Sequence, residues 1–342
     1  MKVLQIGPKS IHVEKYVSAI SKKGLACYLT SEEVCDFSGI ELEKTISFRS
    51  LNPLKLLSSY GDLKRFVKAV SPDIIHIHQV NRMAYFATKI ASRMNIPVVT
   101  TAWGSDVLVV PNKNGFFKFL VTKTLRRSHV ITADSKDMIA KMQLLEPNQN
   151  KYHLVQYGID PIQAIEKEEI IFSNRLHEVN YRLPEIIHYF NDFKASNPTW
   201  KLVIAGTGSL TNELKKLVNQ LELNKDVLFV GWLNAGQNAE FYSKSSIYVS
   251  IPESDGTSVS VLEAMSAGCI PVVPNIEVSK EWVKDGVNGV IESQDKNPFS
   301  EAIKIDPIAC SKINHEIITK SATRDACVSE FYKLYKKLDR NG

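Results

Sequence analysis

Short apolar segments alternate with amphipathic segments along the whole chain. In the first half, β-branched runs near 1–6, 73–78 and 97–101 are each followed by apolar residues at helical spacing. The same pattern starts again at 170–173. This alternation is typical of parallel strands that are joined by crossover helices. We therefore predict an α/β fold with two doubly wound, Rossmann-like sheets.

The chain is long enough for two domains. At 342 residues it exceeds the size of a single ordinary core. Gly158 and Pro161 are typical of a hinge. We expect an N-terminal domain at 1–158, joined by a C-terminal helix at 323–342, and a second domain at 159–322. Because open α/β sheets bind ligands at the carboxyl ends of their strands, we expect the two domains to face each other across a cleft.

Composition excludes several classes of protein. The chain is 44% hydrophobic and 23% charged, as in soluble globular proteins. It shows no apolar run of about 18 residues and no signal-peptide pattern. The five cysteines form no C-x-x-C pair, which favours a reducing cytoplasm and argues against a metal cluster. The net charge of +5 suits anionic ligands or a membrane surface, and no ladder of aromatic and basic residues indicates nucleic-acid binding.

One stretch, S-I-P-E-S-D-G-T-S-V-S-V-L-E-A-M-S-A-G, joins the end of a strand to a polar turn and a helix. Asp255 and Gly256 form the turn, and we expect Thr257 or Ser258 to cap the helix. A helix N-terminus suits a phosphate, and Glu263 lies about two helical turns further on. The pattern indicates a phosphorylated, polyhydroxylated ligand. The alternative is a structural cap beside a solvated glutamate.

The longer string D-G-T-S-V-S-V-L-E-A-M-S-A-G-C-I-P-V-V resembles the signature of the family-4 retaining glycosyltransferases, which use nucleotide sugars and have the GT-B fold. That signature is an acidic residue, seven intervening residues, and a glutamate followed by A-M-x-x-G-x-P-V. Asp255 holds the first acidic place, where most members carry glutamate, and Glu263 holds the second. L-V-I-A-G-T-G, F-V-G-W, S-N-R, W-G-S-D-V-L and P-D-I-I-H-I-H extend the resemblance over nearly the whole chain.

The resemblance implies that the domain at 1–158 binds the acceptor and the domain at 159–322 binds the nucleotide sugar. It also implies roles for individual residues. Glu263 would bind the ribose, and Asp255 would hold the donor sugar together with the backbone N–H groups of Gly256, Thr257, Ser258 and Val259. The turns containing Gly206, Gly208, Gly231 and Leu233 would lie beside the nucleotide, although G-T-G alone is a weak signal.

Arg175 in S-N-R-L would neutralise the diphosphate of the donor. Physical chemistry favours the same residue, because a guanidinium forks onto phosphate oxygens and stays charged. The alternative is a surface arginine that pairs with Glu178.

The chain departs from the family pattern near this arginine. Most members have a lysine where Asn180 stands. Either Arg182 replaces that lysine, or the helix end and Arg175 suffice without it.

A second departure lies in the first half. Trp103 stands where many members have a histidine, and it can stack on a sugar but cannot exchange protons. Either no histidine is needed there, or His12 or His78 contributes, with a core histidine as the alternative for His78. Asp106, expected to be exposed after Gly104, is the candidate for an acceptor-side contact.

The segment 116–127 joins aromatic and basic residues. This pattern fits a peripheral contact with a membrane surface and a helix with a core-facing apolar stripe equally well.

Together these features imply a metal-independent, retaining hexosyltransferase of the cytoplasm, without a cofactor. A nucleotide diphosphate sugar, with a UDP-sugar favoured, would be its donor. A glycan or lipid-linked glycan of a bacterial-type polysaccharide would be its acceptor. The alternatives are a non-catalytic subunit that binds a sugar nucleotide and an epimerase of GT-B fold.

Overall fold

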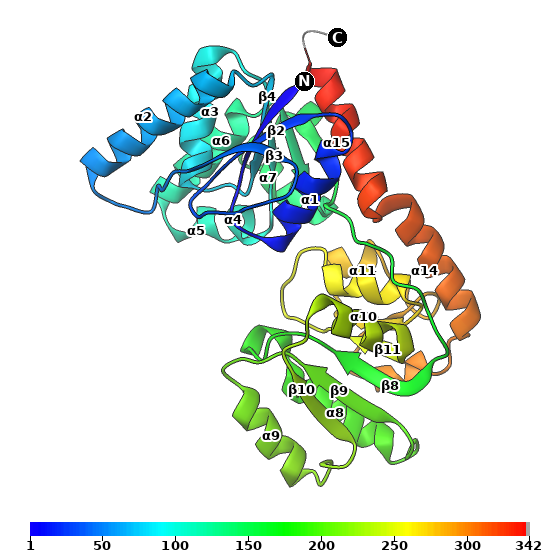
Figure 1. Cartoon of the computed structure of the whole chain (residues 1–342). Coiled ribbons are helices and arrows are strands. Elements are labelled where there is room, and N and C mark those ends of the chain that lie inside the picture. The colour runs from blue at the N-terminus through cyan, green and yellow to red at the C-terminus, as the bar shows by residue number, and fades with distance from the viewer. Residues whose placement is uncertain (340–342) are drawn as a thin grey trace. The chain divides into compact units, whose positions relative to one another are not determined.

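The structure, a computed structural model, describes residues 1–339. The chain forms two compact units, of which unit 1 contains 1–158 and the segment from Arg324, and unit 2 contains 159–323 (Figure 1). Each unit is built on one sheet. Among the described residues, none of the helices combines the length and the apolar character needed to cross a bilayer.

Unit 1 is built on a seven-stranded sheet in the order β3-β2-β1-β4-β5-β6-β7, with all strands parallel. The strands are β1 (Lys2–Ile6), β2 (Ala26–Ser31), β3 (Ile40–Thr45), β4 (Ile74–His78), β5 (Val98–Thr101), β6 (Val130–Ala133) and β7 (Tyr152–Leu154). The helices are α1 (Ile11–Ser21), α2 (Pro53–Val70), α3 (Arg82–Met94), α4 (Ser105–Leu108), α5 (Val110–Lys113), α6 (Gly115–Arg127), α7 (Lys136–Gln143) and α15 (Arg324–Leu338).

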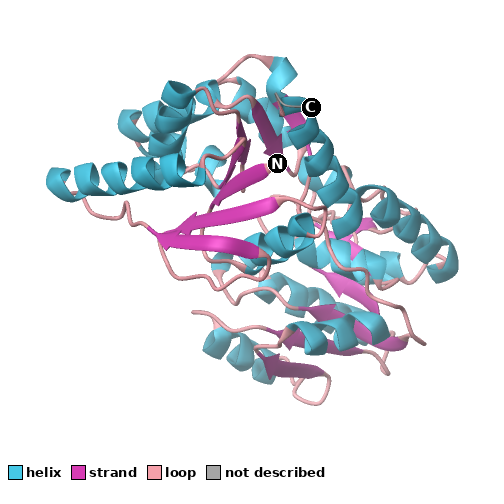
Figure 2. Cartoon of the chain, turned by 45° about the horizontal axis from the view of Figure 1, so that its top comes forward, coloured by secondary structure: helices cyan, strands magenta, loops and turns pink. Residues whose placement is uncertain are grey.

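Helices cover both faces of this sheet (Figure 2). Successive strand residues point to opposite faces, so Val3 packs with α1 and α15 while Leu4 packs with α2 and α3. The two buried layers explain why the central strands read as continuous apolar runs.

Unit 2 has a six-stranded parallel sheet in the order β10-β9-β8-β11-β12-β13. Its strands are β8 (Glu168–Ser173), β9 (Lys201–Ala205), β10 (Val227–Gly231), β11 (Ser245–Val249), β12 (Ile270–Val273) and β13 (Val290–Ile291). Its helices are α8 (Leu183–Lys194), α9 (Thr211–Gln220), α10 (Ala235–Lys244), α11 (Val259–Ser266), α12 (Glu277–Lys280), α13 (Pro298–Ala302) and α14 (Pro307–Ser321). Helices again pack on both faces, so the prediction of two doubly wound sheets is confirmed.

Two elements could not be located from the sequence. The apolar run at 45–48 predicts a third strand, but β3 ends at Thr45, and Ile46 and Phe48 lie in the loop after it, where they pack against α2 and α3. α14 was not predicted, because its buried residues Cys310, Asn314 and Ile318 form a narrow stripe with a polar residue at its centre.

The end of β4 carries two fully buried histidines. His76 and His78 have ring centroids 4.0 Å apart. His76 bonds the Tyr335 hydroxyl of α15 through Nδ1 at 2.5 Å, and His78 donates from Nε2 to Gln5 Oε1 at 2.8 Å. The Nδ1 of His78 accepts from the Tyr157 hydroxyl at 2.6 Å. His78 is therefore a core residue. This agrees with the alternative interpretation of His78 as a core histidine and not with a role at the sugar.

We expect these histidines to make the chain sensitive to acid. Burial lowers the pKa of His78 to about 3 and the pKa of His76 well below its ordinary value. The unfolded chain would bind these protons near pH 6.5, so stability is complete above that pH. Below pH 6.5 the free energy of unfolding should fall by about 1.4 kcal/mol per pH unit for each histidine.

Urea unfolding at pH 7, 6 and 5, with limited proteolysis to identify the transition of unit 1, measures this slope. His78→Gln should make it shallower by about 1.4 kcal/mol per pH unit near pH 5. The exposed His188 of unit 2 provides a control, and His188→Gln should leave the slope unchanged. An unaltered slope in His78→Gln would contradict the role of burial.

Candidate active site

The candidate site lies in unit 2, where β8 and β11 end side by side. These strands pair in parallel, so the segments that follow them emerge at the same edge of the sheet. Arg175 follows β8, and Asp255 lies in the loop between β11 and α11. Although the two residues are far apart in sequence, the topology brings them together.

Arg175 is held on three sides. Its Nη2 donates to Asp255 Oδ2 at 2.7 Å and its Nη1 donates to Ser258 Oγ at 2.8 Å. The guanidinium carbon lies 4.4 Å from the centroid of the Tyr181 ring, in a cation–π contact. The side chain is only 11% exposed. The surface interpretation is wrong, because Glu178 instead accepts from the backbone and hydroxyl of Ser209.

The charges of this pair oppose the effect of burial. Burial raises the pKa of Asp255, and the Arg175 guanidinium lowers it in part. Burial pulls the pKa of Arg175 down, but the charges of Tyr248 and Asp255 outweigh it and leave that pKa raised. The arginine therefore keeps its positive charge in a partly desolvated position.

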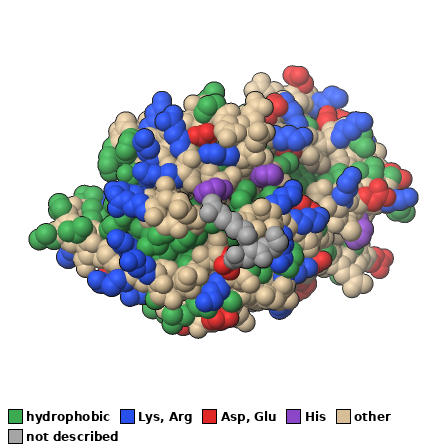
Figure 3. Space-filling view, turned by 90° about the horizontal axis from the view of Figure 1, so that it is seen from above, with side chains coloured by type: hydrophobic (Ala, Val, Ile, Leu, Met, Phe, Trp, Pro, Cys, Tyr) green, Lys and Arg blue, Asp and Glu red, His purple; other side chains and the backbone are tan. Residues whose placement is uncertain are grey.

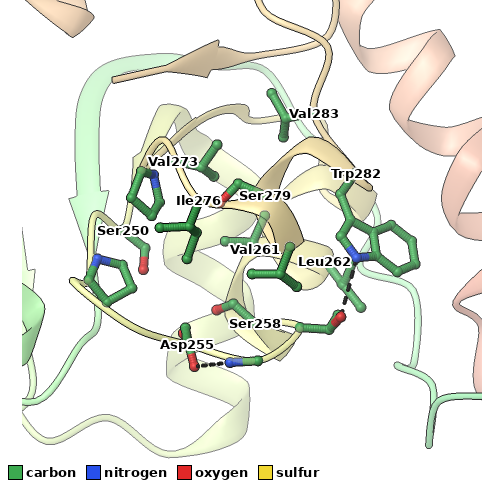
Figure 4. Close-up of a pocket in the computed structure, with 15 residues that line it drawn as sticks. Ser250, Asp255, Ser258, Val261, Leu262, Val273, Ile276, Ser279, Trp282 and Val283 are labelled. Carbon is green, nitrogen blue, oxygen red and sulfur yellow. Dashed lines mark hydrogen bonds between the residues drawn. The ribbon is translucent and has the colours of Figure 1, made fainter. Parts of the chain in front are cut away.

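Neither predicted cap of α11 is made. Ser258 stands at the N-cap position, but its hydroxyl accepts from Arg175 and no side chain caps the helix. The Thr257 hydroxyl accepts from Trp282 Nε1 at 3.3 Å (Figure 4). The first turn of α11, which begins at Val259, therefore presents its backbone N–H groups without a side-chain cap.

Glu263 lies on α11, half-buried. Burial raises the pKa of Tyr248 to about 12, and the charge of Glu263 adds to that increase. The Tyr248 hydroxyl donates to Asn174 Oδ1 at 2.8 Å, next to Arg175 in the sequence.

The Asp255 loop also lines a small cavity of about 30 Å³. Figure 4 shows its mainly apolar lining, with the Ser250 hydroxyl at the edge. That hydroxyl is buried and has no hydrogen-bond partner among residues 1–339. Because one water needs roughly 10–15 Å³, the cavity has room for about two waters and none for a sugar. Arg175 does not line this cavity.

The glycine turn after β9 packs against the segment that carries Arg175. A Cβ on Gly206 would lie 2.6 Å from the Arg175 carbonyl oxygen, and one on Gly208 would lie 2.5 Å from the His177 carbonyl oxygen. Gly206 N donates to the Gly231 carbonyl at 2.7 Å. Leu233 packs nearby against the layer that includes α11. The predicted nucleotide residues therefore gather at one edge of the sheet.

We expect Gly206→Ala to destabilise unit 2 by roughly 2–3 kcal/mol, since its φ of +97° and the contact with Arg175 both oppose a side chain. Gly61→Ala, in the middle of α2 with no atom within 4 Å of the added Cβ, should stabilise the chain by roughly 0.5–1 kcal/mol. Thermal unfolding compares the two. Equal midpoints for both variants would contradict the close approach.

Arg182 does not join this group. Its Nη1 and Nη2 donate to Glu292 at 2.8 and 3.0 Å, and its Nε contacts Glu185 at 3.4 Å. The interpretation that it replaces the missing lysine is therefore not supported by its geometry. Asn180 has a role that sequence reasoning missed: its carbonyl accepts from Glu253 N at 2.8 Å, and its Nδ2 donates to the Ser254 carbonyl at 3.1 Å. It fastens the loop that carries Asp255.

Asp106 in unit 1 is not exposed, contrary to the prediction. It is 3% exposed and accepts from Val80 N at 2.7 Å and Trp103 N at 3.0 Å. Burial raises the pKa of this carboxyl. Trp103 donates from Nε1 to the Tyr157 hydroxyl at 3.1 Å. Asp106 thus anchors two loops and does not present its carboxylate to solvent.

Comparison with known proteins gives matches over nearly the whole chain. Residues 2–135 match the family described as glycosyl transferase 4-like, and residues 159–320 match the glycosyl transferases group 1. The chain is 24% identical to the putative glycosyltransferase EpsD of Bacillus subtilis, over 76% of this chain and 74% of that one. It is 19% identical to the alpha-monoglucosyldiacylglycerol synthase of Acholeplasma laidlawii, over 86% and 82%.

Solved structures share the fold. Anabaena Alr3699/HepE in complex with UDP superposes with a TM-score of 0.78 at 13% identity, over 98% of this chain and all of that one. A glycosyltransferase from Rickettsia africae gives a TM-score of 0.76 at 15% identity, over 100% and 99% of the two chains.

Proposed function

The chain belongs to the family-4-type glycosyltransferases of the GT-B fold, and from this premise we propose that it transfers a hexose from a nucleotide diphosphate sugar to a glycan or lipid-linked glycan. The reaction retains the configuration of the sugar, needs no metal or other cofactor, and serves cell-surface polysaccharide synthesis in a bacterial cytoplasm. The observation that carries this proposal is the buried Arg175, fixed beside the uncapped start of α11.

A leaving diphosphate needs a positive charge beside it. As the bond from the sugar to the nucleotide breaks, negative charge grows on the phosphate oxygens. Arg175, held beside the N–H groups of α11, would stabilise that charge, since donors fixed near a developing charge lower the barrier. Asp255 would contact the donor sugar and Glu263 the ribose. The acceptor hydroxyl attacks from the face that the diphosphate leaves, without a covalent enzyme intermediate.

Relatives support the choice of substrates. Structures of HepE hold UDP, UDP with glucose, and UDP-glucose, which favours a UDP-sugar as the donor. The Acholeplasma relative is named for a glycolipid product, and a Xanthomonas relative, 23% identical over 74% of this chain, is named for a diphosphopolyprenol acceptor. Both names support an acceptor attached to a lipid.

A lipid-linked acceptor would require contact with a membrane surface. The stripe Leu120, Val121, Thr124 and Leu125 of α6 is buried, so the core-facing interpretation of that helix holds. Phe116 and Phe119 lie outside the stripe and are 59% and 47% exposed, with Lys123 over the Phe119 ring. In the view of Figure 3, Lys and Arg side chains are interspersed with hydrophobic ones. The exposed Phe116 and Phe119 beside Lys123 support a peripheral contact with an anionic membrane.

A panel of UDP-glucose, UDP-galactose, UDP-N-acetylglucosamine and GDP-mannose tests the proposal. At 100 times its dissociation constant, the true donor should stabilise the chain by about 2.7 kcal/mol. It should also release its nucleotide, faster when an acceptor is present. Stabilisation without release would favour the non-catalytic subunit, and sugar isomers formed without an acceptor would favour the epimerase. Neither stabilisation nor release with any of the four would contradict all three.

A further inference from the structure

A groove in unit 1 has no role in the chemistry described so far. It consists of two adjoining pockets of about 320 and 160 Å³, which share Glu32, Arg49, Gln79 and Asn81. These residues follow the carboxyl ends of β2, β3 and β4, where open α/β sheets bind ligands. A hexose needs roughly ten times the 10–15 Å³ of one water, so even the smaller pocket has room for a sugar ring.

The two pockets differ in chemistry. Seven of the eleven residues that line the smaller one are polar or charged, and they come from the ends of β1, β2, β3 and β4. The larger one has an apolar wall that is formed by Phe48, Val80, Val110, Phe117, Leu120 and Val121. A ligand that fills the groove must therefore be polar at one end and apolar at the other.

A strained turn sets the boundary between the pockets. Gln79 has a φ of +91°, which costs roughly 1–3 kcal/mol for a residue with a side chain. The turn is held by hydrogen bonds from Gln79 N to the Thr101 carbonyl at 2.9 Å and from Val80 N to the buried Asp106 at 2.7 Å. Asp106 is thus a positioning residue, and the turn that it fixes places Gln79 on the lining of both pockets.

The charges of the groove are balanced. Arg49 pairs with Glu32 at 2.7 Å, and Arg82 donates from Nη1 to the carbonyl oxygens of Phe48 and Ser50 at 2.8 and 3.0 Å. Cationic and acidic side chains are equal in number in each pocket. Amide, carboxylate and guanidinium groups suit hydroxyls, which both donate and accept. The lining therefore favours a neutral sugar over a polyanionic one.

We propose that this groove binds an amphipathic glycoside, with a neutral sugar ring in the smaller pocket and an apolar aglycone against the Phe117 wall. The inference rests on the proposed function, because it names the class of acceptor. A wholly polar polysaccharide would leave the apolar wall in contact with water and gain nothing from it.

The test compares n-octyl β-D-glucopyranoside with methyl β-D-glucopyranoside, and the two matching galactosides, by calorimetric titration below the micelle-forming concentration. The octyl glycoside of at least one sugar should bind at least tenfold more tightly than its methyl counterpart. Phe117→Ser should remove that difference. Leu144→Ser is the control, since Leu144 is an apolar residue of the same unit, is 86% exposed and lies outside the lining of both pockets.

Gln79→Gly provides a second, independent measurement. It removes the amide and relieves the positive φ, so affinity for both glycosides should fall severalfold while the midpoint of thermal unfolding stays the same or rises. Equal binding of octyl and methyl glycosides, equal losses in Leu144→Ser and Phe117→Ser, or full affinity in Gln79→Gly would each overturn the inference. UDP binding, measured on the same samples, separates the two proposals: its absence in the wild type counts against the proposed function and not against the groove.

Discussion

Replacing Arg175 with alanine is expected to lower kcat/KM for transfer by roughly 10²–10³-fold, the usual effect of removing one preorganised donor from a developing anion. The guanidinium is 11% exposed and is held in place by Asp255, Ser258 and Tyr181, and a bound diphosphate would replace Asp255 as the partner of Nη2. Arg175→Lys should recover only part of the loss, since an ammonium keeps the charge but not the planar fork or the stacking on Tyr181.

Arg182→Gln is the matched control for this substitution. Arg182 lies seven residues further along and pairs with Glu292, so its loss should lower stability while kcat/KM of the folded enzyme stays within about threefold. Steady-state transfer, UDP titration and thermal unfolding of each variant measure these effects. An unchanged UDP affinity in Arg175→Ala would remove Arg175 from the site, and an equal loss of turnover in Arg182→Gln would restore Arg182 as the substitute for the missing lysine.

The sheets could be predicted because buried parallel strands carry their own signal. Strands such as β4 and β11 are covered on both faces and read as continuous apolar runs, and their order along the chain follows from right-handed crossovers. The edge strand β3, I-E-L-E-K-T, is exposed and polar, so the apolar loop beside it gave the stronger signal. Sequence patterns report burial, and they indicate strands only where burial and pairing coincide.

The partners of charged side chains could not be predicted in the same way. Arg175 was identified from the family resemblance of S-N-R-L and from the chemistry of a guanidinium, but its contacts Asp255 and Ser258 lie about eighty residues away. For the same reason the prediction for Asp106 was wrong. Its sequence context indicated an exposed turn residue, whereas in the structure its carboxylate accepts from the backbone N–H groups of Val80 and Trp103. A short polar sequence shows that a loop exists, and only the fold determines which groups meet there.

Asp255→Asn should change donor binding and turnover in opposite directions. In the structure Asp255 Oδ2 lies 2.7 Å from Arg175 Nη2 and so occupies a donor position that a phosphate would use. The asparagine keeps a hydrogen-bonding oxygen but removes the competing charge. A partly exposed ion pair is worth roughly 0.5–1 kcal/mol, so UDP should bind about two- to fivefold more tightly. If the carboxylate also contacts the donor sugar, kcat should fall by roughly tenfold or more.

Asp255→Glu separates charge from length in the same experiment. It keeps the carboxylate and adds the carbon that most family members have, so UDP affinity should remain close to that of the wild type. Calorimetric titration with UDP and initial rates with the identified donor give the two quantities for each variant. Weaker UDP binding in Asp255→Asn would show that Asp255 orients Arg175 for the phosphate and does not compete with it, because removing a competitor can only increase the affinity of the guanidinium for an anion.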